Sequence, residues 1–281
     1  AAARQAIEAG SFEKADARLA DAERLDLEAG EGRLTRAARS IEQRAALARS
    51  EGRLMDAADL YARAAGLVRA YEPFDWARLK YNEGFAAYER GQQDPDRDAL
   101  DRAVSAYREA LTAFTRERAP MDRAETQNNL GTALFALAKR GDDAALTEAI
   151  TAFSNALEER TRERVPSDWA MTKCNLGSAL AELGKEGDDA ALSDAIGAFL
   201  EVLEVWTHER EPVLWASTMV NLGNVLTIVG ERGDETALRH AVGAYRGALE
   251  QLSAADHSRR RVSAKISLGT AFSLLGFRGD E

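Results

Sequence analysis

The chain has 281 residues, of which 45% are hydrophobic and 30% are charged, so it carries enough apolar side chains for a buried core and is not expected to be disordered. Its 37 Lys and Arg against 47 Asp and Glu give a net charge of −10, which excludes nucleic acid as the main ligand because phosphate binding needs a basic surface. The single Cys174 excludes an internal disulfide framework and a zinc cluster built from cysteines.

A short motif returns along the chain with a period of 46 residues. The triplet Asn129-Leu130-Gly131 recurs at 175–177 and 221–223, in a weaker form at 267–269, and faintly at 82–84. A second set keeps the same period, in which an alanine is followed four residues later by an aromatic residue. Its members are Ala57 and Tyr61, Ala103 and Tyr107, Ala149 and Phe153, Ala195 and Phe199, and Ala241 and Tyr245. Such regular self-similarity predicts a repeat protein.

In chain order, the motif divides the sequence into repeats at 1–30, 31–72, 73–119, 120–165, 166–211 and 212–257, with a partial repeat at 258–281. Proline is tolerated at the start of a helix, so the equivalent prolines of four repeats predict helix starts at Pro73, Pro120, Pro166 and Pro212. Within 120–165 two apolar helical stripes are separated by Gly141-Asp142-Asp143, where glycine ends one helix and aspartate caps the next. Each repeat is therefore predicted to be a helical hairpin, and no segment has a strand pattern.

The glycine of the motif lies inside each predicted first helix, at Gly131, Gly177, Gly223 and Gly269. Glycine costs roughly 1 kcal/mol relative to alanine there, so its recurrence indicates a contact too close for a Cβ atom. The alanine and aromatic residue of the second helix are expected to fill that site. A lone hairpin cannot bury both of its apolar stripes, so the hairpins are expected to stack.

The last repeat contains only a first helix. Its apolar residues Leu268, Phe272 and Leu275 are therefore expected to be exposed, and Glu281 is expected to be the boundary of a fragment of a longer protein.

These features together resemble the tetratricopeptide repeat: Leu-Gly in a first helix, glycine seven residues later, then alanine, an aromatic residue four positions on and alanine three positions further. The resemblance covers the whole chain, although 46 residues exceed the family's repeat of about 34. Long repeats of this kind look like arrays of bacterial multidomain proteins. The resemblance implies an all-α fold, a right-handed α-solenoid of stacked antiparallel helical hairpins. It also implies that the first helices line a concave surface where peptides bind.

One face of the predicted first helices carries the candidate binding site. Asparagine recurs on it at Asn82, Asn129, Asn175 and Asn221. A primary amide both donates and accepts hydrogen bonds, so a ladder of amides can pair with the backbone of an extended peptide. The other candidate partner-binding residues of this face are Asn224, Arg78, Glu125, Thr132, Ser178 and Glu182. The alternative is that the asparagines hydrogen-bond locally and stabilise packing between repeats.

Catalytic, metal and membrane functions have little support in the sequence. His208, His240 and His257 lie at unrelated positions of the repeat, and Cys174 has no evident histidine partner, so no enzyme, metal site or cofactor is predicted. No apolar stretch is expected to reach the roughly 18–20 residues of a membrane span, and no secretory leader is expected. A cytoplasmic location is expected.

The predicted function is therefore a protein–protein interaction scaffold that binds a peptide or partner segment in its concave groove, with a neutral-to-basic segment favoured by the acidic chain. The alternative, which the family resemblance implies, is a regulatory or sensor arm of a larger bacterial effector with a caspase-like peptidase or signalling domain. A third hypothesis is self-association through the exposed C-terminal helix.

Overall fold

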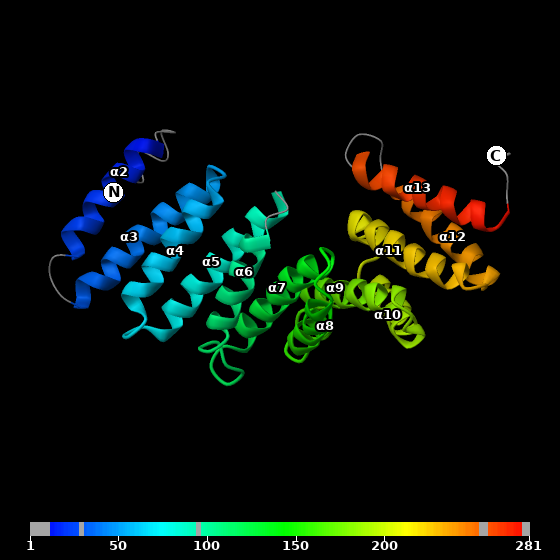
Figure 1. Cartoon of the computed structure of the whole chain (residues 1–281), viewed down its shortest axis with the longest axis horizontal. Coiled ribbons are helices and arrows are strands. Elements are labelled where there is room, and N and C mark those ends of the chain that lie inside the picture. Colours follow the sequence, from blue (N-terminus) through cyan, green and yellow to red (C-terminus); the bar gives the residue numbers. More distant parts are fainter. Residues whose placement is uncertain (1–11, 28–30, 94–96, 253–257, 277–281) are drawn as a thin grey trace. The chain divides into compact units, whose positions relative to one another are not determined.

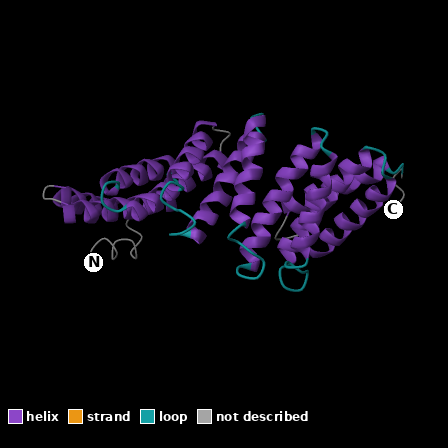
Figure 2. Cartoon of the chain, turned by 90° about the horizontal axis from the view of Figure 1, so that it is seen from below, coloured by secondary structure: helices purple, strands orange, loops and turns teal. Residues whose placement is uncertain are grey.

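The structure, a computed structural model, describes residues 12–27, 31–93, 97–252 and 258–276, and within these ranges it is helical and contains no strand (Figure 2). The described helices are α2 (Phe12–Leu27), α3 (Glu31–Ser50), α4 (Leu54–Val68), α5 (Pro73–Gln93), α6 (Arg97–Ala110), α7 (Pro120–Ala138), α8 (Asp143–Leu157), α9 (Pro166–Lys185), α10 (Asp189–Leu203), α11 (Pro212–Glu231), α12 (Glu235–Gln251) and α13 (Ser258–Leu274). They pair in sequential hairpins, in which α3, α5, α7, α9, α11 and α13 are first helices and the even-numbered helices are second helices. The predicted all-α architecture of stacked helical hairpins is confirmed.

The predicted punctuation marks the helix boundaries. α5, α7, α9 and α11 each begin at a proline, whose fixed φ suits the first helical position and whose missing N–H would be unpaired there anyway. At the turns of the α9–α10 and α11–α12 hairpins, Gly187 and Gly233 adopt φ of +117° and +107°, which favour glycine. The next residues, Asp188 and Asp234, accept hydrogen bonds from the backbone N–H of Ala191 and Ala237 at 2.9 and 3.0 Å and so cap α10 and α12.

The extra length of the repeat lies in two places. The first helices α5, α7, α9 and α11 contain 19 to 21 residues. The second helices α6, α8 and α10 are shorter, with 14 or 15 residues, and are followed by segments of irregular structure at 111–119, 158–165 and 204–211. The long repeat therefore extends the first helix and the connection to the next hairpin.

The chain forms two compact units, an N-terminal unit of residues 1–148 and a C-terminal unit of residues 149–281. In the N-terminal unit, each helix from α2 to α6 packs on the helix that follows it, as Figure 1 shows for the blue to green ribbons. In the C-terminal unit, α9, α10, α11, α12 and α13 pack on one another in the same sequential manner. The core of each unit lies between successive helices, as expected for stacked hairpins.

In three hairpins, an aromatic ring of the second helix packs directly on a glycine of the first helix, and we call this contact a glycine socket. A Cβ atom added at Gly84 would lie 2.9 Å from the ring of Tyr107, and one added at Gly223 would lie 2.6 Å from Cε1 of Tyr245. At Gly177 the nearest ring atom, of Phe199, would be 3.1 Å away. The expected close approach of the aromatic residue to the motif glycine is therefore present in both units.

The residue seven positions after each of these glycines is also a glycine, and it forms a second close contact with the same second helix. A Cβ atom added at Gly91, Gly184 or Gly230 would overlap a leucine side chain of the following second helix. Both glycines of the first helix thus allow the second helix to approach closely.

The exposed face of α13 differs from the prediction. Leu268, Phe272 and Leu275 are partly buried because they pack on the cluster of Ala241, Val242 and Tyr245 in α12. The prediction that they are exposed was wrong. The exposed apolar side chains of α13 are instead Val262, Ile266 and Leu274, with 56%, 65% and 44% of their surface accessible.

Helix α11 is more apolar than expected. Its 20 residues have the length and composition of a membrane span, which corrects the expectation that no such stretch exists. In the structure α11 packs on α9, α10, α12 and α13, and Leu222 and Val225 lie in a cluster with Leu192 and Phe199 of α10. These helices bury 39% of the apolar stretch of α11 in the C-terminal unit.

Candidate functional site

In the N-terminal unit, the candidate face of α5 is engaged with α3. Arg78 forms an ion pair with Glu42 of α3, with Nη2 and Oε2 3.1 Å apart, and a weaker one with Asp75. The hydrogen bond to Glu42 raises the pKa of Arg78 and so keeps the guanidinium charged. Farther along the helix, Glu89 accepts two hydrogen bonds from Arg49 of α3, at 2.5 and 3.2 Å.

A hydrogen-bonded chain joins α5 to α7. The hydroxyl of Tyr81 donates to Oε1 of Glu125 at 2.6 Å and accepts from Nδ2 of Asn129 at 2.9 Å. The amide oxygen of Asn129 in turn accepts from Nδ2 of Asn128 at 3.2 Å. The Asn129 amide therefore both donates and accepts within the protein, as the local-bonding alternative requires. Asn82, one residue after Tyr81, is half-buried.

In the C-terminal unit, Asn221 of α11 lies against α9. Its Nδ2 group donates to Sγ of Cys174, with N and S 3.8 Å apart. Burial raises the pKa of the Cys174 thiol, so the sulfur is a neutral acceptor. Asn175, the next residue of α9, is half-buried. Asn129 and Asn221 thus occupy the same repeat position and each bonds to the preceding first helix of its own unit.

Three further candidates, Thr132, Ser178 and Glu182, bond within their own helices. The hydroxyl of Thr132 donates to the backbone oxygen of Asn128 at 2.9 Å, and that of Ser178 to the backbone oxygen of Cys174 at 3.0 Å. Glu182 accepts from Nζ of Lys185, one turn later, at 2.7 Å. These three hydrogen bonds of Thr132, Ser178 and Glu182 thus lie within single helices.

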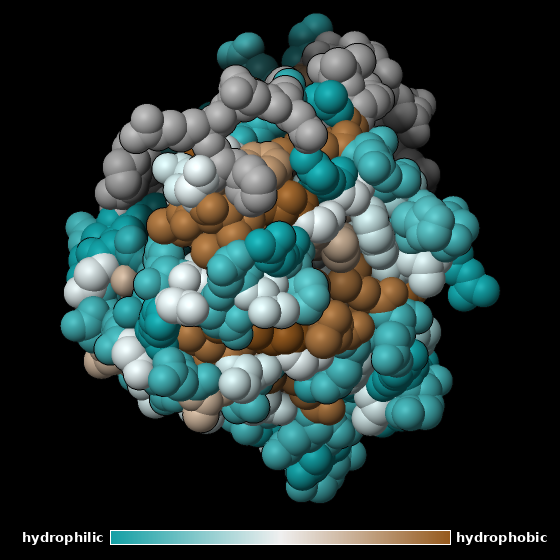
Figure 3. All heavy atoms as spheres, turned by 90° about the vertical axis from the view of Figure 1, so that its right-hand side faces the viewer, coloured by the Kyte–Doolittle hydropathy of each residue, from teal (hydrophilic) through white to brown (hydrophobic). Residues whose placement is uncertain are grey.

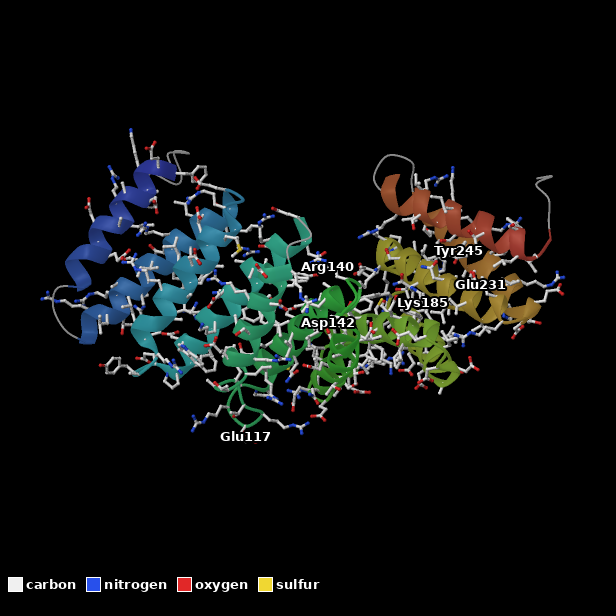
Figure 4. All side chains as sticks on the ribbon, in the orientation of Figure 1. Glu117, Arg140, Asp142, Lys185, Glu231 and Tyr245 are labelled. Carbon is white, nitrogen blue, oxygen red and sulfur yellow. The ribbon has the colours of Figure 1, made fainter. Side chains whose placement is uncertain are left out.

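The remaining candidate, Asn224, lines a groove. This groove has a volume of about 480 Å³ and is bordered by first helices α9, α11 and α13 and by one side chain of α12. Its polar lining includes Lys185, Asn224, Glu231, Tyr245, Ser267 and Thr270. Figure 4 labels Lys185, Glu231 and Tyr245 at this part of the C-terminal unit.

The floor of the groove is fixed by a buried tyrosine. Tyr245 reaches it from α12, and its hydroxyl donates to the amide oxygen of Asn224 at 2.9 Å and lies 3.1 Å from Oγ1 of Thr227. Burial raises the pKa of Tyr245, so the phenol stays protonated and remains a donor. The bond holds the amide of Asn224 by its oxygen. Among the described residues, the Nδ2 group of Asn224 has no hydrogen-bond partner, and the residue is exposed.

The charges that border the groove are unevenly paired. Lys185 is paired with Glu182, and Arg232 bonds to Asp189 and to the backbone oxygen of Gly184. Glu231 has no ion-pair partner among the residues that the structure describes, and it is exposed. The groove therefore presents one unpaired carboxylate beside two neutralised cations.

Sequence reasoning identified Asn224 but not the residues around it. Tyr245 was assigned to packing within the hairpin, because it is the aromatic residue that follows the repeat alanine, Ala241. Tyrosine also occurs at this repeat position as Tyr61 and Tyr107, so the signal that distinguishes Tyr245 is Thr227, where the two preceding repeats have Ala181 and Phe135. Over the described parts of the chain, no group of three His, Cys, Asp or Glu residues could hold a metal ion.

Comparison with known proteins finds similarity in structure only. No protein-family model matches the chain, and no curated protein matches its sequence. The MamA protein is 17% identical, with a TM-score of 0.54 over 81% of this chain and 96% of that one. BtubC (BKLC) from P. vanneervenii is 18% identical, with a TM-score of 0.55 over 96% and 95% of the two chains. The apo quorum sensor NprR from B. thuringiensis is 14% identical, with a TM-score of 0.52 over 98% and 80%.

At these identities the likeness concerns the fold. The sequential hairpins, the glycine sockets and these similarities define an α-solenoid of the tetratricopeptide-repeat type.

Proposed function

We propose that the chain is a protein-binding scaffold that holds an extended peptide segment in the groove between α9, α11 and α13, without a catalytic step of its own. The observation that carries the proposal is the state of Asn224. Its amide oxygen is fixed by the buried Tyr245, and its amide N–H groups are left for a ligand. A pre-oriented donor costs less ordering entropy on binding than a mobile one, so this amide is suited to bind a peptide carbonyl.

The hydroxyls of Ser267 and Thr270, on the α13 side of the groove, support the same role. They border it on α13. The hydroxyl of Thr270 donates to the backbone oxygen of Ile266, and that of Ser267 bonds to Tyr245, so both oxygens are suited to accept from a peptide N–H. The amides of Asn129 and Asn221 are engaged between first helices, so the proposal assigns them to the support of the stack. This places the peptide-reading group at Asn224 instead of along the whole asparagine series.

The charge of the groove favours a basic side chain in the bound segment. Lys185 and Arg232 already have carboxylate partners, whereas Glu231 offers an exposed carboxylate. The net charge of −10 attracts such a segment over a longer range, although salt screens that effect. We therefore propose that the partner segment carries lysine or arginine next to Glu231.

An array of nonapeptides with randomised sequence tests this proposal. The 281-residue chain is expected to select peptides that contain a basic residue. Glu231→Gln should weaken the selected peptides about twofold to fivefold, as expected for loss of one exposed ion pair. Asn224→Ala should weaken them irrespective of their basic residue, because it removes a backbone contact.

Asp194→Asn is the matched control, since Asp194 is exposed on α10 and does not border the groove. It removes the same charge and is expected to leave binding unchanged. If Asp194→Asn weakens binding as much as Glu231→Gln, only the net charge matters. If neither Glu231→Gln nor Asn224→Ala changes binding, the groove is not the binding site.

A further inference from the structure

One face of α13 has the composition of a buried helix face but is exposed. Val262, Ile266 and Gly269 follow one another at spacings of four and three residues, so they lie on the same side of the helix. More than half of the surface of Val262 and of Ile266 is accessible, and a Cβ atom at Gly269 would meet no atom within 4 Å. Figure 3 views the chain from the end that carries α12 and α13 and shows apolar surface there.

The equivalent residues of the preceding repeat, in α11, show which helix packs on this face there. The residues 46 positions earlier are Ala216, Val220 and Gly223 of α11, and all three contact α12. Ala216 lies in a cluster with Ala248 and Leu252, and Gly223 receives the ring of Tyr245. In α11 this face is therefore the one that holds the second helix of the hairpin.

The chemistry of a helix that fits such a face can be taken from the second helices themselves. From α4 to α12, each second helix has leucine, alanine three residues later, an aromatic residue four residues further and a small or β-branched residue after another three. The four described examples within single units are Leu54, Ala57, Tyr61 and Ala64; Leu100, Ala103, Tyr107 and Ala110; Leu192, Ala195, Phe199 and Val202; and Leu238, Ala241, Tyr245 and Ala248. The aromatic residue is the one that enters the glycine socket.

We propose that the Val262–Ile266–Gly269 face of α13 is a docking surface for an amphipathic helix of a partner, with an aromatic side chain that packs on Gly269. The surface continues the α11–α12 interface by one repeat, so the partner helix would lie on α13 as α12 lies on α11. Helix-in-groove recognition through anchors three, four and seven residues apart is a general mode of partner binding. This site is separate from the groove that contains Asn224.

A synthetic peptide of residues 188–206 serves as the probe, because it contains the α10 pattern together with its capping residue Asp188. Fluorescence anisotropy with the labelled peptide and the 281-residue chain is expected to show saturable binding of one peptide per chain. A peptide with Phe199→Ala should bind at least about tenfold more weakly, because it leaves the socket at Gly269 empty.

Two variants of the chain locate the site. Gly269→Leu fills the socket and Ile266→Asp places a charge on the face, and each should weaken the peptide at least about tenfold. Both positions are exposed, so the variants should unfold at the same temperature as the unsubstituted chain or above it. The matched control is Gly243→Leu, at an exposed glycine of α12 where a Cβ atom also meets nothing within 4 Å, and it should leave binding unchanged.

Three results would overturn the proposal: absence of peptide binding, equal binding by the Gly269→Leu and Ile266→Asp variants, or a concentration-dependent dimer in sedimentation that Ile266→Asp abolishes. The last would show that a second copy of the chain occupies this face, as the self-association hypothesis holds. Glu231→Gln is expected to leave binding of the helical peptide unchanged, so failure here is distinguishable from failure of the proposed groove.

Discussion

Replacement of Gly223 by alanine tests the packing principle of the stack. The ring of Tyr245 is 1% exposed and is held by hydrogen bonds to Asn224 and Thr227, so it cannot move aside without loss of those bonds. A Cβ atom at position 223 would lie 2.6 Å from Cε1 of that ring. Overpacking of this kind costs about 1–3 kcal/mol, whereas alanine gains up to about 1 kcal/mol over glycine in a helix. Gly223→Ala is therefore expected to destabilise the C-terminal unit by about 1–2 kcal/mol.

Urea and thermal unfolding followed by circular dichroism measure this change, with hydrogen exchange of α11 and α12 to locate it. A loss of this size corresponds to a fall of about 3–6 °C in the midpoint temperature. Gly243→Ala is the matched control, because the space around Gly243 is open, and it should stabilise the chain by about 0.5–1 kcal/mol.

A double-mutant cycle isolates the contact. In a chain that already carries Tyr245→Ala, the change Gly223→Ala should be neutral or stabilising, because the overlapping ring is absent. If Gly223→Ala stabilises the otherwise unsubstituted chain as much as Gly243→Ala does, the close contact does not explain the recurrent glycine.

Three further predictions concern single side chains. Arg160 is 5% exposed, and although its Nη1 donates to Thr172, its buried Nε has no partner in the described structure. Because the equivalent residues of other repeats are apolar, Arg160→Leu should stabilise the chain by about 1–2 kcal/mol in urea unfolding. A loss of stability would contradict this reasoning. The thiol of Cys174, whose pKa is raised by burial, should react with iodoacetamide at pH 8 at least about tenfold more slowly than in urea-unfolded chain, and equal rates would refute its protection. Asp188→Ala should cost about 1 kcal/mol and speed hydrogen exchange at the start of α10, because the cap on Ala191 is lost; unchanged exchange there would show that the cap is dispensable.

Much of the fold could be predicted because the repeat presents the same local rules several times. Proline at a helix start and glycine before aspartate at a turn each depend on the conformation of a few neighbouring residues, so Pro166, Gly187 and Asp188 define their boundaries from the sequence alone. The glycine sockets were predictable for another reason. A residue that is unfavourable in a helix and returns at a fixed period requires a tertiary cause.

Other features could not be predicted, because they depend on distances between helices and the sequence period does not determine these distances. The face of α13 that packs on α12 and the adjacent face that stays open both have apolar residues, so the sequence could not distinguish Leu268 from Ile266. The bond from Asn129 to Tyr81 depends on how close α7 lies to α5. Likewise, the groove that includes Asn224 arises only where α11 and α13 border it with the Tyr245 hydroxyl.

The side-chain hydrogen bonds of Asn129 and Asn221 between successive first helices couple binding of a ligand at these amides to the spacing of the hairpins. Asn129 holds α7 to α5 and Asn221 holds α11 to α9, each within its own unit. A molecule that competes for either amide must break a bond that sets the spacing of two adjacent hairpins. Within each unit, a ligand that binds the amide of Asn129 or Asn221 would therefore also break a contact between two adjacent first helices. Those helices could then move apart, while the glycine sockets within each hairpin would remain in place.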